Sequence, residues 1–138
     1  MMTPFLVGTL LAVVVAVIGK VTRFDQDRSF YSTVLIIIAS YYVLFAIQGA
    51  STDALVWEIV VALAFLAVAL FGALRVPLLV GIGIVAHGLF DLVHPVIIHN
   101  PGVPSWWPSF CMSIDVALGL WVIGLSRFRQ TPPQRAFP

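Results

Sequence analysis

Residues 54–74 read ALVWEIVVALAFLAVALFGAL, and this stretch sets the structural class of the chain. Glu58 is its single charged residue. A helix that crosses a bilayer needs about 20 consecutive apolar residues, with a range of about 17–25. The apolar residues are continuous and do not alternate with polar ones, which favours a helix over a strand of a membrane barrel. The stretch therefore predicts a transmembrane helix over Ala54–Leu74.

Apolar segments of similar character lie on both sides of this stretch. The chain has 138 residues, of which 61% are hydrophobic and 9% charged, whereas soluble domains have about 45–50% apolar and about 25% charged residues. A soluble fold of this size has too little interior to bury so much apolar surface, so lipid must cover part of it. We predict an all-α, polytopic bundle whose four further spans are Pro4–Gly19, Phe30–Ala50, Leu78–His94 and Ser109–Leu125.

The connections between these segments carry recognisable helix signals. Asp53 is a good N-cap residue for the third helix, and Pro77 suits the first position of the fourth. Pro95 is expected to end the fourth helix and to begin a loop over Pro95–Pro108, which holds two tryptophans. Because the other connections are short, consecutive helices should pack as antiparallel neighbours. We expect one five-helix domain over residues 1–129 and a polar, disordered tail over residues 130–138.

The basic residues predict the orientation of the bundle. With five spans all of them fall on one side of the membrane, whereas four spans would divide them. This places the N-terminus outside and the C-terminus in the cytoplasm, and the first apolar segment is expected to be a retained span rather than a signal peptide. The basic residues are too dispersed for a nucleic-acid surface; they are Lys20, Arg23, Arg28, Arg75, Arg127, Arg129 and Arg135.

Ionisable residues inside the spans indicate where a function resides, because burying them in a membrane is costly. At about 1.5 Å rise per residue, those of the third, fourth and fifth spans all lie within roughly 10 Å of the outer face. On the fourth span His87, Asp91 and His94 share one helical face. Imidazole and carboxylate groups suit Zn²⁺, Fe²⁺ or Cu²⁺. The predicted metal ligands are His87, Asp91, His94, Asp115, His99 and Glu58.

Other interpretations of this cluster stay open. A metal site could serve a hydrolase or an oxidoreductase that acts on a lipid-soluble substrate, although the sequence assigns no catalytic residue. The polar residues could instead fix helix packing in an accessory subunit of a larger membrane complex or of a homo-oligomer. A single pigment or haem ligand is a third option, because Gly83 could leave room for a flat ring beside His87. Cys111 is interpreted as a packed thiol.

Residues 86–116 carry a resemblance to a known family. They read AHGLFDLVHPVIIHNPGVPSWWPSFCMSIDV. The H-x3-D-x2-H helix end, the N-P-G-V-P-x-W-W-P-x-F-C loop and the following aspartate resemble a family of small, uncharacterised bacterial integral membrane proteins. The resemblance implies a multi-pass protein of the bacterial cytoplasmic (inner) membrane. It also implies that one unit is formed by His87, Asp91, His94, Trp107, Pro108, Cys111 and Asp115.

Overall fold

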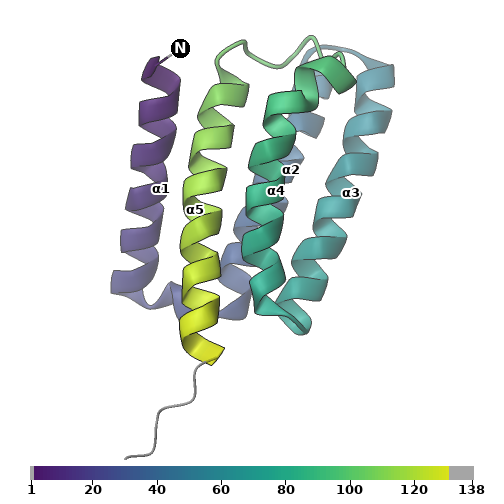
Figure 1. Cartoon of the computed structure of the whole chain (residues 1–138). Helices are drawn as coiled ribbons and strands as arrows, with labels where there is room; N and C mark the ends of the chain where they lie inside the picture. The colour runs from purple at the N-terminus through teal and green to yellow at the C-terminus, as the bar shows by residue number, and fades with distance from the viewer. Residues whose placement is uncertain (1, 131–138) are drawn as a thin grey trace, which may run out of the picture.

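Five long helices form the part of the protein that the computed structural model describes, residues 2–130 (Figure 1). Each is long and apolar enough to cross a membrane, and no strand occurs within these residues. This confirms the expectation of an all-helical, multi-pass protein. The predicted tail lies outside the described residues except for Gln130, which ends the last helix. The elements are α1 (Met2–Thr22), η1 (Phe24–Gln26), α2 (Arg28–Gln48), α3 (Thr52–Leu74), α4 (Pro77–Ile97) and α5 (Trp107–Gln130).

Two of the expected helix ends are wrong, and local hydrogen bonding explains both. Ser51 rather than Asp53 caps α3, because the Ser51 hydroxyl accepts a bond from the Ala54 backbone N–H (3.2 Å) and Asp53 already lies in the first turn. Helix α4 continues through Pro95 to Ile97. Proline removes one backbone donor, and the next N–H after the helix, that of Ile98, still bonds to the preceding turn. Pro77 begins α4 as expected.

Helix α5 lies between α1 and α4, and α4 also packs against α3 and α2 (Figure 1). The expectation that consecutive helices are neighbours is therefore wrong at the first connection, since the main helical partner of α1 is α5. Small residues explain this pairing: the buried residues of α1 are Gly8, Ala12, Ala16 and Gly19. At Gly8 an added Cβ would collide with the backbone carbonyl of Phe110. Such close helix approach is what small residues permit in membranes.

Glycines also bring α4 and α5 together. A Cβ added at Gly119 would lie 2.8 Å from the Val85 nitrogen, and one added at Gly88 would lie 2.9 Å from the Cβ of Asp115. Both separations are shorter than an ordinary van der Waals contact. Helices α4 and α5 therefore approach each other closely at about the depth of their polar side chains.

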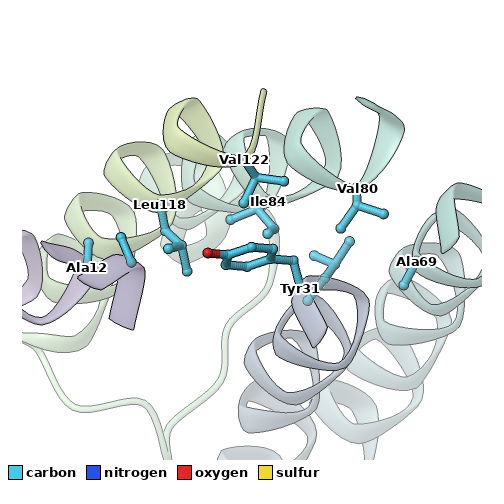
Figure 2. Packing of buried hydrophobic residues seen from close by; sticks show 9 residues of the cluster. Ala12, Tyr31, Ala69, Val80, Ile84, Leu118 and Val122 are labelled. Carbon is cyan, nitrogen blue, oxygen red and sulfur yellow. The ribbon is translucent and has the colours of Figure 1, made fainter. Parts of the chain in front are cut away.

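An apolar core fills one half of the bundle. Its residues surround Tyr31 and come from all five helices (Figure 2). We call this half the basic end, because Lys20, Arg28 and Arg75 lie at the helix termini there. The opposite half, the loop end, contains the connections over residues 49–51 and 98–106 and the N-terminal end of α1 (Figure 1). The core residues shown are Ala12, Ala16, Tyr31, Leu35, Ala69, Val80, Ile84, Leu118 and Val122.

Candidate metal centre

Four potential metal ligands meet between α4 and α5 in the loop-end half. They are His87, Asp91, Cys111 and Asp115, none more than 2% exposed, and one ligand atom from each lies within 4.8 Å of all the others. His87 Nδ1 lies 2.8 Å from Asp115 Oδ2 and 3.7 Å from Asp91 Oδ2. The Cys111 thiol donates to Asp115 Oδ2 at 3.6 Å. Each helix contributes two residues spaced i, i+4, which places both on one helical face.

Tyr42 of α2 orients one of these carboxylates. Its hydroxyl donates to Asp91 Oδ1 at 2.7 Å. The other oxygen, Oδ2, is buried and has no hydrogen-bond partner. Asp91 is thus held through one oxygen, and the second is directed toward His87 Nδ1. A buried carboxylate oxygen without a hydrogen bond is costly, and a cation beside it would remove that cost.

A second polar group lies nearer the loop. His94 Nε2 lies 2.7 Å from Glu58 Oε1. The Asn100 side-chain amide donates to the same oxygen (2.8 Å) and to the backbone carbonyl of Tyr42 (3.1 Å). Glu58 Oε2 is buried without a hydrogen-bond partner. The Tyr42 ring stacks on the His94 ring with centroids 3.9 Å apart, so Tyr42 contacts both polar groups.

The loop over residues 98–106 packs onto this second group. Asn100 is 8% exposed, and its side-chain oxygen accepts a bond from the Gly102 N–H at 3.2 Å. Gly102 lies so close to the end of α2 that a side chain there would collide with the Phe45 carbonyl. A pocket of ≈ 220 Å³ remains between the loop and the end of α4, and its polar lining includes His94, His99 and Asn100.

The structure divides the six predicted ligands. His87, Asp91 and Asp115 come together, His94 and Glu58 form a separate pair, and His99 is exposed at the loop pocket. Cys111, interpreted above as a packed thiol, joins the first group. The sequence feature that could have placed Cys111 in this group is its i, i+4 spacing from Asp115, which puts both side chains on one helical face.

The space expected beside Gly83 is absent. A Cβ added there would lie 2.8 Å from both Leu35 Cδ2 and Val68 Cγ1, because these side chains fill the face that a flat ring would occupy. The expectation that Gly83 leaves room for a flat ring beside His87 is therefore wrong.

The donor chemistry of the four-residue group fits a transition-metal ion. Bonds from zinc to nitrogen, oxygen and sulfur are about 2.0–2.3 Å long, so the ligand atoms of a tetrahedral site lie roughly 3.3–3.8 Å apart. The present separations, up to 4.8 Å, require modest side-chain movements of roughly 1 Å. The unpartnered Asp91 Oδ2 and the neighbouring thiol are both available as ligands.

The chain matches a known protein family over most of its length. A family model described as "Family of unknown function (DUF6010)" matches residues 1–128. No curated protein and no solved structure matches the chain. The family match covers the whole helical bundle up to residue 128, whereas the resemblance seen in the sequence covered residues 86–116.

Proposed function

This chain belongs to that family of unknown function, and we propose that it is a membrane protein that holds a transition-metal ion, Zn²⁺, Fe²⁺ or Cu²⁺, between α4 and α5. One observation carries the proposal: imidazole, thiol and two carboxylate donors converge within 4.8 Å in a buried part of the bundle. Nitrogen, sulfur and oxygen donors together suit these metals better than Mg²⁺ or Ca²⁺, which prefer oxygen alone.

The distribution of charge supports an outer-face position for this site. Lys20, Arg28 and Arg75 lie at the termini of α1, α2 and α3, respectively, and all three termini are at the basic end. The four-residue group lies in the opposite half of the bundle. By the positive-inside rule the basic end faces the cytoplasm. We therefore propose a metal site near the outer face of the bacterial cytoplasmic membrane.

A closed donor set favours metal holding or electron transfer over hydrolysis. Structural zinc sites use four protein ligands, whereas hydrolytic sites keep one position open for water. Here four donors are present and all of them are buried. On the cytoplasmic side the site is followed by the apolar core around Ile84 and Leu118, and the buried residues of this core include no histidine, cysteine, aspartate or glutamate to which an ion could pass. Metal would therefore reach the site and leave it from the loop end.

Metal analysis of the purified full-length protein tests this proposal. We expect about one transition-metal ion per chain in wild type and in Asp53→Asn, which alters an exposed carboxylate elsewhere in the same half. Cys111→Ser and Asp115→Asn should lose the ion, because each removes a donor without a large change of volume. With Co²⁺ bound, wild type should show thiolate-to-metal charge-transfer absorption that Cys111→Ser lacks. Folded wild-type protein without metal uptake would refute the proposal.

A packing network is the alternative, and the hydrogen bonds within the two groups favour it. Asp115, Asp91 and Glu58 each accept a bond from a neighbouring helix or from the loop without any metal. Such a network can fix the register of helices in an accessory subunit. In that case wild type would bind no metal, Asp115→Asn would lower stability, and partner subunits would co-purify in fixed stoichiometry.

A further inference from the structure

A groove lies between α1 and α5 on the lateral surface of the bundle, in the half that contains the basic end. Its volume is ≈ 360 Å³, and it is open to the surface. Alanines of both helices line it and leave space that larger side chains would fill. Helix α1 lies at the edge of the bundle (Figure 1), so lipid surrounds the groove in a bilayer. Lys20 is the single charged residue of the lining, and the other lining residues are Ala12, Val13, Ala16, Val17, Val21, Ala117 and Trp121.

The length of the groove matches one leaflet of a bilayer. From Ala12 to Val21 helix α1 rises by about 14 Å, at about 1.5 Å per residue. The hydrocarbon core of a bilayer is about 30 Å thick, so one leaflet contributes about 15 Å. Lys20, in the last turn of α1, therefore lies near the headgroups, and Ala12 lies near the middle of the membrane.

The volume of the groove fits a hydrocarbon chain and excludes a helix. A space of ≈ 360 Å³ holds about twelve groups of the size of a water molecule, and a methylene group has a similar size. A helix segment about 14 Å long and about 10 Å in diameter would displace roughly 1,100 Å³. The groove can therefore hold one acyl chain, but not a helix of a second copy of this protein.

Lys20 gives the basic-end mouth of the groove a positive charge. Its side chain is 63% exposed, and its Nζ lies 3.9 Å from Asp25 Oδ2. An ammonium group has three N–H donors, so it can bind a phosphate oxygen while it keeps this contact. By the positive-inside rule the basic end faces the cytoplasm, where the bilayer leaflet carries anionic lipids.

We propose that the groove binds one anionic phospholipid of the cytoplasmic leaflet, with an acyl chain between α1 and α5 and the phosphate at Lys20. This site goes beyond the metal centre and does not depend on it, because the two lie in opposite halves of the bundle. Trp121 forms a fixed wall of the groove, since its Nε1 donates to the Tyr31 hydroxyl at 3.2 Å and the residue is 39% exposed. A wall that is already ordered lowers the entropic cost of binding.

Quenching of Trp121 fluorescence by brominated phospholipids tests the proposal. Phenylalanine replaces the other three tryptophans, Trp57, Trp106 and Trp107, which all lie toward the loop end. This parent protein is reconstituted at full length in equal mixtures of anionic phosphatidylglycerol and zwitterionic phosphatidylcholine, with bromine on the acyl chains of one lipid at a time. Trp121 should be quenched more strongly by the anionic lipid, with a preference of about five-fold, which is the effect of one lysine near an anionic surface.

Two pairs of variants separate the headgroup contact from the groove itself. Lys20→Gln should abolish the preference for the anionic lipid, whereas Arg75→Gln should keep it, because Arg75 is an exposed basic residue at the same end that does not line the groove. Val17→Phe fills the groove and should reduce quenching by either lipid. Val14→Phe should not, since Val14 is exposed on the same helix but lies outside the lining.

Equal quenching by the two lipids in the parent protein would overturn the proposal, because the groove would then hold bulk lipid without selecting a headgroup. Weak quenching by both lipids, together with disulfide formation between chains that carry Val13→Cys, would also overturn it, since a second copy would then cover the groove. If the tryptophan replacements prevent folding, the phospholipid that stays bound to purified wild type is counted instead. About one phosphatidylglycerol per chain that is lost in Lys20→Gln would support the site, and its retention in Lys20→Gln would contradict it.

Discussion

Replacement of Gly88 by alanine tests whether close packing of α4 against α5 creates the four-residue group of His87, Asp91, Cys111 and Asp115. The new Cβ would lie 2.9 Å from the Cβ of Asp115 and 3.2 Å from the backbone oxygen of Met112. Carbon atoms in ordinary contact lie about 3.5–4.0 Å apart, so the helices must separate locally by roughly 0.6–1.1 Å. The bond between His87 Nδ1 and Asp115 Oδ2, now 2.8 Å long, would lengthen and weaken.

The expected loss of stability is that of overpacking a close interface, about 1–3 kcal/mol. Alanine also has a higher helix propensity than glycine, by about 0.5–1 kcal/mol. Gly124→Ala is a matched control for this second effect, because nothing lies within 4 Å of a Cβ added at Gly124. The difference between the two variants therefore isolates the packing cost.

Reversible unfolding in mixed micelles provides the assay. Gly88→Ala should be about 1–3 kcal/mol less stable than Gly124→Ala. The affinity of the four-residue group for Zn²⁺ should also fall in Gly88→Ala, whereas Gly124→Ala should keep the wild-type value. Equal stability and equal zinc affinity in the two variants would show that the close contact of the helices does not position the site, and the argument from glycine packing would fail.

Three further predictions concern other parts of the chain. Tyr42→Phe removes the hydroxyl that orients the Asp91 carboxylate and should weaken zinc binding, measured by titration of the metal-free protein, by about 10–100-fold. Tyr41→Phe, at an exposed neighbour, should leave the zinc affinity unchanged. Cysteine introduced at Val103 should react with an impermeant thiol reagent from outside and cysteine at Arg75 only from the cytoplasm; external labelling at position 75 would contradict the orientation. Backbone and side-chain hydrogen bonds from the first turn of α2 lower the pKa of Asp27 below its usual value of 3.8, so its capping contribution is present above about pH 4 and lost as the pH falls through the lowered pKa; Asp27→Asn should lack this acid-sensitive component in unfolding measured against pH.

The spans and the basic end could be predicted from local composition. Apolar runs such as Ala54–Leu74 need no knowledge of their neighbours, because in a bilayer each helix satisfies its own backbone hydrogen bonds. The common face of His87, Asp91 and His94 follows from helical periodicity alone. Where the local signals competed, prediction failed: Ser51 and Asp53 are both good caps, and the hydrogen bond to Ala54 assigns the role to Ser51.

Helix pairing and the composition of the sites depend on tertiary contacts. The apolar faces of the five helices resemble one another in sequence, so the preference of α1 for α5 emerges only where glycine meets backbone at Gly8. The same kind of contact at Gly88 sets the register that brings Cys111 into the four-residue group and leaves His94 outside it. A one-dimensional pattern gives the depth and face of each polar residue, but the distance between side chains on different helices is set by how closely their backbones pack.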